Sequence, residues 1–203
     1  MATGKSGPQG GAPEALSVRL VLGFYALMGG AALAWRLLAD GVPPWAEGPT
    51  SAPLSLPLRI GLGLAGGAAL VAVSRVWTLR TAAGRALAAE LARLLGPLSL
   101  PRAWAFAAAS GLAEEAFFRG ALQPRVGWLG ATLIFAAAHF VPAPKLWSWA
   151  VFALAAGALF GALFAATGDL LAPLLAHVLV NGLNLRWIAA REEAAGDRSL
   201  LRR

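Results

Sequence analysis

Apolar runs of about twenty residues recur along this chain, and they constrain its fold more strongly than any other feature. A helix needs about 20 predominantly apolar residues to cross the hydrocarbon core of a bilayer. Runs of this character lie at residues 18–38, 58–77, 103–122, 126–140, 146–167 and 170–188. We therefore predict an all-α fold, a polytopic membrane helix bundle with about six transmembrane helices.

The composition supports a membrane protein and argues against other classes. The 203 residues are 58% hydrophobic and only 13% charged, with a mean hydropathy of +0.65, whereas a soluble domain carries about a quarter charged residues. The net charge of +7 comes from arginines at the ends of apolar runs, as the positive-inside rule expects. The lipid bilayer is therefore an expected partner and nucleic acid is not. The absence of cysteine excludes disulfides, thiolate metal ligands and a cysteine nucleophile.

The chain divides into one membrane domain with two tails. Residues 1–14 are small, polar and rich in glycine and proline, a composition typical of a disordered segment. Residues 15–190 form the predicted integral-membrane domain, and residues 191–203 form a charged C-terminal tail, interfacial or disordered. Within the domain, residues 98–188 contain the last four apolar runs and form the candidate catalytic core.

Residues 78–95 differ from the apolar runs and predict an amphipathic interfacial helix. Arg80, Arg85, Glu90 and Arg93 recur among alanines and leucines at helical spacing. Such a helix lies along a membrane surface with its arginines toward anionic headgroups. The positive-inside rule places this basic connection in the cytoplasm. With six crossings, both termini are then cytoplasmic, and we predict a multi-pass protein of the cell (inner or plasma) membrane.

Two adjacent carboxylates and an arginine interrupt the run at 103–122, where charge is costly and therefore indicates function. Glu115 and Arg119 are four residues apart, so they share a helix face and are expected to pair. Glu114 lies about 100° around the helix from Glu115. One carboxylate is thus neutralised within its own helix while the other remains available to a partner, a division common in acid/base sites.

The two histidines of the chain, His139 and His177, lie in the fourth and sixth apolar runs, and Asn181 follows His177 on the same helix face. With Glu114 they could converge on one polar pocket inside the bundle. Imidazole and carboxylate groups can bind a divalent metal. They can equally activate a water with Glu as general base, while His and Asn stabilise an oxyanion. Singly, each residue has a structural interpretation, as a brace, a core histidine or interhelical glue; together they favour a site.

The order and spacing of these residues resemble the CPBP family of intramembrane proteases, named for CAAX-prenyl proteases and bacteriocin-processing proteins. The resemblance covers about residues 98–188. It is carried by three motifs: Glu114-Glu115-x-x-x-Arg119, Phe135-x-x-x-His139 and His177-x-x-x-Asn181.

The resemblance implies a role for each residue of the motifs. Glu114 and His139 would activate the hydrolytic water. His177 and Asn181 would hold the oxyanion, or His177 would join Glu114 and His139 in a metal site. The resemblance leaves open whether the cofactor is a divalent metal such as zinc or none. Glu115 and Arg119 would form a supporting pair.

The function expected from the resemblance is intramembrane hydrolysis of a peptide bond in a membrane-associated peptide or protein, prenylated or not. Two other classes remain compatible with the sequence. One is a non-catalytic immunity or scaffold protein of the same fold. The other is a small transporter, since buried Glu and His also mark transport paths; it ranks last because the polar residues gather in one place and no inverted repeat is evident. Oligomeric state is not predicted.

Overall fold

The computed structural model describes residues 17–46 and 54–200, and every regular element in these two segments is helical. The all-α prediction is therefore confirmed. The predicted tail at 1–14 lies outside the described residues. In chain order the elements are α1 (Val18–Asp40), α2 (Leu56–Arg80), α3 (Ala82–Leu95), α4 (Leu100–Glu114), the π-helix η1 (Glu115–Leu122), α5 (Gln123–Ala138), α6 (Trp147–Thr167) and α7 (Leu171–Leu200).

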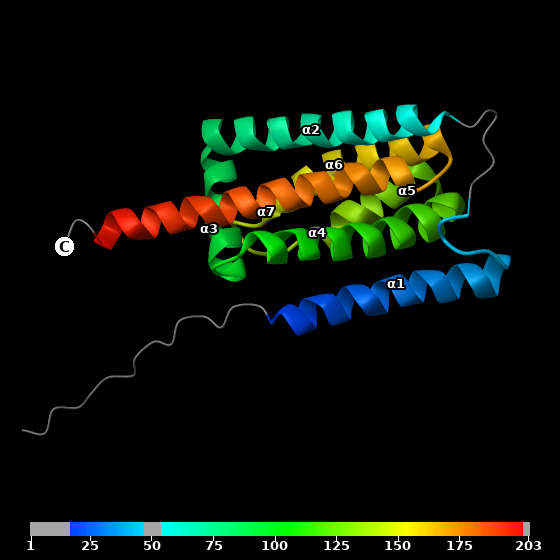
Figure 1. Cartoon of the computed structure of the whole chain (residues 1–203), viewed down its shortest axis with the longest axis horizontal. Coiled ribbons are helices and arrows are strands. Elements are labelled where there is room, and N and C mark those ends of the chain that lie inside the picture. The colour runs from blue at the N-terminus through cyan, green and yellow to red at the C-terminus, as the bar shows by residue number, and fades with distance from the viewer. Residues whose placement is uncertain (1–16, 47–53, 201–203) are drawn as a thin grey trace, which may run out of the picture.

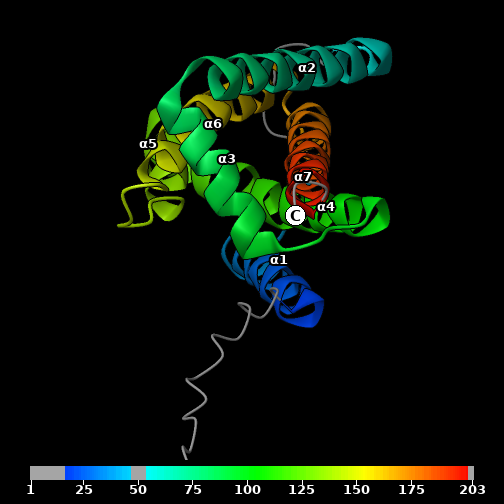
Figure 2. The same cartoon turned by 90° about the vertical axis from the view of Figure 1, so that its left-hand side faces the viewer.

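The long helices run side by side, and the short α3 crosses one end of the bundle. In Figure 1, α1 and α2 lie on opposite sides, with α4, α6 and α7 between them. Figure 2 looks onto the end of the bundle and shows α3 passing from α2 toward α4 across the ends of the other helices. One end of the bundle is thus covered by a helix of its own.

Four described helices, α1, α2, α6 and α7, are long and apolar enough to cross a membrane. This supports a multi-pass membrane protein. The expected count of six crossings is not confirmed, because the runs at 103–122 and 126–140 fold differently from continuous spans. The first changes from α-helix to π-helix at Glu115, and the helix that carries the second has a kink at Gly127, whose φ is 74°.

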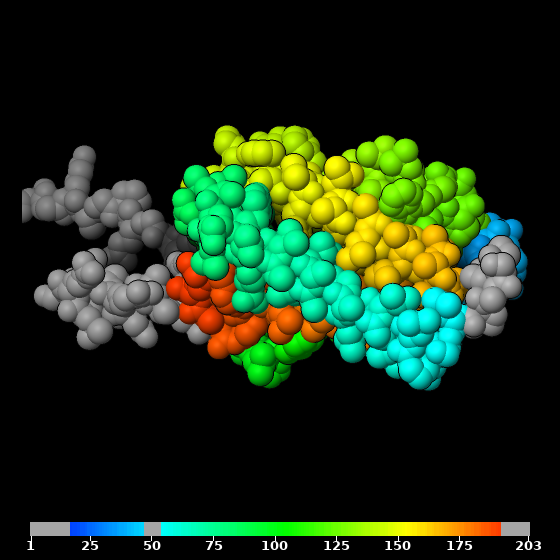
Figure 3. Space-filling view, turned by 90° about the horizontal axis from the view of Figure 1, so that it is seen from above, coloured from blue at the N-terminus to red at the C-terminus, as the bar shows by residue number. Residues whose placement is uncertain are grey.

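Helix α2 packs closely on α7 because small residues line their contact. A Cβ atom added to Gly63 would lie 2.6 Å from the Ala172 carbonyl oxygen, and one added to Gly67 would lie 3.0 Å from Ala176 Cα. Such close backbone approach is how transmembrane helices gain packing energy where the solvent is itself apolar. Figure 3 shows α2 lying along the bundle beside α6 and α7.

The amphipathic segment at 78–95 forms α3 only from Ala82, because α2 continues as far as Arg80. Thr81 separates the two helices, and its side-chain oxygen accepts a hydrogen bond from the Gly84 backbone N–H at 2.9 Å. The apolar face of α3 is buried in the protein, with Leu87 at 7% and Ala92 at 5% exposure. The amphipathic pattern therefore matches the protein interior, and the interfacial position remains a prediction.

Candidate active site

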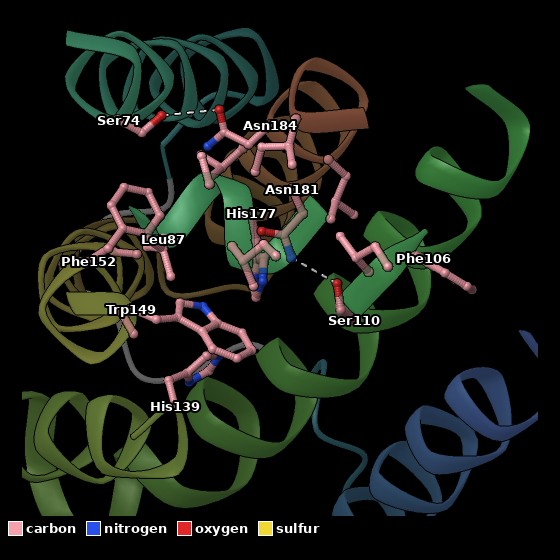
Figure 4. Close-up of a pocket in the computed structure, with 18 of the residues that line it drawn as sticks. Ser74, Leu87, Phe106, Ser110, His139, Trp149, Phe152, His177, Asn181 and Asn184 are labelled. Carbon is pink, nitrogen blue, oxygen red and sulfur yellow. Dashed lines mark hydrogen bonds between the residues drawn. The ribbon is translucent and has the colours of Figure 1, made fainter. Parts of the chain in front are cut away.

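A cavity of about 310 Å³ lies inside the bundle at the end covered by α3. Its wall is mostly apolar and aromatic, interrupted by a few polar groups, the usual character of a small-molecule or peptide site. All the predicted catalytic residues line it. Figure 4 shows the histidines and Asn181 facing this space. The polar residues of the wall are Tyr25, Ser74, Thr78, Ser110, Glu114, His139, His177, Asn181 and Asn184.

Glu114 is the meeting point of the two histidines. It is the last residue of α4 and only 6% exposed. Its Oε2 atom lies 3.7 Å from His139 Nε2 and 3.9 Å from His177 Nε2. Oε2 is buried and has no hydrogen-bond partner among the described residues. A buried polar atom left open in this way commonly marks a place where a water or a ligand binds.

The Nδ1 atom of each histidine contacts a fixed hydrogen-bond acceptor, and this contact determines whether Nε2 carries a proton or a lone pair. His139 Nδ1 lies 2.8 Å from the Phe135 carbonyl oxygen, and His177 Nδ1 lies 2.6 Å from Glu115 Oε1. A carbonyl oxygen can only accept, so Nδ1 of His139 donates, and the carboxylate favours the same arrangement at His177. In the neutral imidazoles Nε2 then carries a lone pair directed toward Glu114, as in metal ligands and general bases.

The predicted pair of Glu115 and Arg119 is present and fully buried. Arg119 Nη1 donates to Glu115 Oε1 at 3.0 Å, and both side chains are 1% exposed. Arg119 also donates from Nη2 to the Gly157 carbonyl oxygen at 3.1 Å, with its guanidinium carbon 4.5 Å from the centre of the Phe135 ring. The pair thus ties η1 to α5 and α6. The contact of Glu115 with His177 adds a link to α7 that the sequence did not predict.

The adjacent carboxylates separate as predicted, although the helix that carries them changes type between them. Glu114 ends α4, and Glu115 begins the π-helical turns of η1. π-helical segments within helices are frequent at functional sites. Glu114 faces the two imidazoles, whereas Glu115 contacts Arg119 and only one imidazole, that of His177. The two carboxylates therefore have different surroundings.

Asn181 is oriented by Ser110, which the sequence analysis missed. The Asn181 Nδ2 atom donates to Ser110 Oγ at 2.9 Å, and the Ser110 hydroxyl donates to the Ala107 carbonyl oxygen at 3.2 Å (Figure 4). Ser110 lies four residues before Glu114, on the same face of α4. That spacing was a usable signal, because Glu114 and its i−4 neighbour must face the same cavity.

Tyr25 was also missed, and no sequence signal points to it. It is the one tyrosine of the chain and lies on α1, far from the motifs in sequence. It lines the cavity, and its hydroxyl lies close enough to the Glu114 carboxylate for the two groups to interact. Only the packing of α1 against α4 brings the two together.

The described residues contain no group of three or more His, Cys, Asp or Glu arranged to hold a metal ion. Glu114, His139 and His177 are close, but their facing atoms are 3.7 and 3.9 Å apart. A water that hydrogen-bonds to the carboxylate and an imidazole would bind beside these atoms, because the spacing is too short for a water to fit between them. The expected metal therefore stays a prediction.

The comparisons with known proteins agree with the motifs. Residues 96–183 match the family described as type II CAAX prenyl endopeptidase Rce1-like. A 71-residue stretch is 39% identical to a Bacillus subtilis (strain 168) protein described as the uncharacterized protein YpbD, covering 35% of this chain and 37% of that protein. This chain thus spans little more than a third of that relative. No solved structure matches.

Proposed function

We propose that this chain, whose residues 96–183 match the Rce1-like family, is an intramembrane endopeptidase. It hydrolyses a peptide bond of a membrane-associated peptide or protein. We place it in the cell membrane with both termini in the cytoplasm. The observation that carries the proposal is the buried Glu114 Oε2, which lies within 4 Å of two imidazole nitrogens in the cavity.

The water that attacks the peptide bond bridges Glu114 and His139 from the cavity side in this proposal. Both facing atoms are acceptors, so a water there donates one hydrogen to each and directs a lone pair toward the cavity. Glu114 takes a proton as the water oxygen bonds to the carbonyl carbon. The same proton then passes to the leaving nitrogen as the C–N bond breaks. General-base assistance of this kind contributes about 10²–10⁴-fold to a rate.

The oxyanion of the tetrahedral intermediate is stabilised by Asn181 and His177. Ser110 takes up one N–H of the Asn181 amide, which leaves the second for the oxyanion. His177 can donate from Nε2 only as an imidazolium, with its Nδ1–H on Glu115. We infer that Glu115 holds the imidazole in place through Nδ1 and so acts on the reaction through His177. One oxyanion donor contributes about 10²–10³-fold to kcat.

The proposal is tested by Glu114→Gln, which keeps the size of the side chain and removes the base. We expect cleavage of a fluorogenic peptide ending in a prenylated CAAX sequence to fall by about 10²–10⁴-fold, with the product identified by mass spectrometry. Glu90→Gln is the matched control, since Glu90 lies on α3 in contact with Arg93 and Lys145 and does not line the cavity. A Glu114→Gln variant that cleaves at the wild-type rate would refute the mechanism. If such a variant also fully restored a deletion phenotype, the protein would be a non-catalytic member.

A further inference from the structure

Asn184 is a polar residue of the cavity that the proposed mechanism does not use. It follows Asn181 by three residues on α7, and both side chains line the cavity. Three residues advance about 4.5 Å along an α-helix. Asn184 therefore lies about one turn from the oxyanion site.

The orientation of the Asn184 amide is determined by Arg75 of α2. Arg75 Nε donates to Asn184 Oδ1 at 3.3 Å. A guanidinium has donors only, so the atom that faces it must be the oxygen. Ser74 Oγ donates a hydrogen bond to the same oxygen at 3.1 Å. Figure 4 shows this oxygen turned toward Ser74 and the nitrogen on the other side, facing the cavity.

Arg75 is itself held in place, so the amide is presented on a rigid support. Its Nη2 donates to the Leu183 carbonyl oxygen at 2.8 Å. Its guanidinium carbon lies 4.2 Å from the centre of the Trp187 ring, within the range of a cation–π contact. Side chains held by packing and secondary hydrogen bonds lose little freedom when a ligand binds.

The cavity facing this amide is apolar. Leu87 of α3 and Phe152 and Trp149 of α6 form the opposite wall (Figure 4). The two N–H groups of the Asn184 amide favour binding of a ligand that brings a hydrogen-bond acceptor, because the hydrocarbon groups around them offer none. A peptide backbone carries one carbonyl acceptor per residue and fits this requirement.

We propose that Asn184 binds a backbone carbonyl of the substrate peptide, one or two residues from the scissile bond. The proposal rests on the proposed function. An extended chain advances about 3.3 Å per residue, so the spacing of about 4.5 Å between the two asparagines falls between one and two residues of the peptide. Asn181 then acts on the reacting carbonyl and Asn184 sets the register of the peptide.

The first test compares Asn184→Asp with Ser74→Ala, using the prenylated CAAX peptide above. Asp keeps the oxygen that Arg75 and Ser74 hold, but presents a second oxygen where the donor was. We expect KM to rise roughly tenfold, the loss of one hydrogen bond of ordinary strength, with kcat within about twofold. Ser74→Ala should raise KM only about twofold, because Arg75 still orients the amide.

The second test locates the contact and separates the two proposals. Peptides with one carbonyl oxygen at a time replaced by sulfur, a poorer acceptor, are bound to the inactive Glu114→Gln protein. Sulfur at one peptide position should weaken binding to the Glu114→Gln protein that keeps Asn184. The same sulfur should not weaken binding to the Glu114→Gln protein that also carries Asn184→Asp. If sulfur at every position weakened binding to both proteins equally, the role of Asn184 would be refuted and the proposed function would stand. An unchanged KM for Asn184→Asp in an active enzyme would have the same consequence. A wild-type protein that neither binds nor cleaves the peptide would overturn both proposals for this substrate class.

Discussion

Replacement of Arg119 by methionine should destabilise the protein because it leaves a buried carboxylate without its cation. Arg119 and Glu115 are 1% and 0% exposed, and Glu115 Oε2 already has no hydrogen-bond partner among the described residues. Methionine fills much of the volume of the arginine stem, so the main loss is the charge. Breaking a buried ion pair from one side costs about 3–5 kcal/mol.

This cost can be measured as a shift in thermal unfolding. For a chain of about 200 residues, 1 kcal/mol lowers Tm by roughly 2–4 °C, so Arg119→Met should lower Tm by about 6–20 °C in detergent. The double variant Glu115→Gln with Arg119→Met removes both charges and should recover most of the loss, since no uncompensated charge remains. Proteolytic activity should stay low in the double variant, because His177 loses its carboxylate partner.

Two results would refute this reasoning. A single Arg119→Met variant with a Tm within about 1 °C of wild type would show that the pair is not a structural brace. A double variant no more stable than the single one would show that the loss comes from packing around the guanidinium, where Phe135 lies at 4.5 Å, and not from charge.

Further predictions test the site, the packing and the cofactor. Ser110→Ala should lower kcat about tenfold, because the Asn181 amide loses the partner that orients it, whereas Ser110→Thr should retain most of the activity; equal rates for wild type and Ser110→Ala would contradict this. Tyr25→Phe should lower kcat/KM several-fold while Tm stays unchanged, which separates a donor to Glu114 from a packing role. Gly67→Ala should lower the free energy of unfolding by about 1–3 kcal/mol, the cost of overpacking, and Tm should fall with it. Gly61→Ala should leave Tm unchanged, because nothing lies within 4 Å of the added atom. Activity measured before and after chelation, with metal analysis of the purified protein, decides whether a divalent metal is required; activity that survives complete metal removal would exclude that requirement.

The sequence predicted much of the fold, because the decisive signals were local. Apolar length, helical spacing and the change of character at 78–95 depend on residues near one another in the chain. Most helix boundaries followed with errors of a few residues, but α7 continues to Leu200 and takes in most of the predicted tail at 191–203. The count of crossings did not follow, because hydropathy alone does not reveal a π-helical segment at Glu115 or a kink at Gly127.

The motifs likewise named four polar residues of the cavity, Glu114, His139, His177 and Asn181, without giving their partners. Helical spacing alone separated Glu114 from Glu115 and paired Glu115 with Arg119. The contacts of Glu114 with His139 and His177 required three helices to pack in one arrangement. Ser110 could have been found from its position one turn before Glu114; Tyr25 could not.

What the sequence determined by itself was therefore the class of fold, the intrahelical pair and the polar residues of the three motifs, since periodicity acts within a single helix. What the tertiary structure decided was which groups the polar side chains contact and where α3 lies. Glu115 reaches His177, Arg75 turns the Asn184 amide, and α3 covers the cavity rather than lying free. Each of these depends on contacts between helices distant in sequence. The physical reason is that a hydrogen bond acts over about 3 Å, and only packing brings such groups within that range.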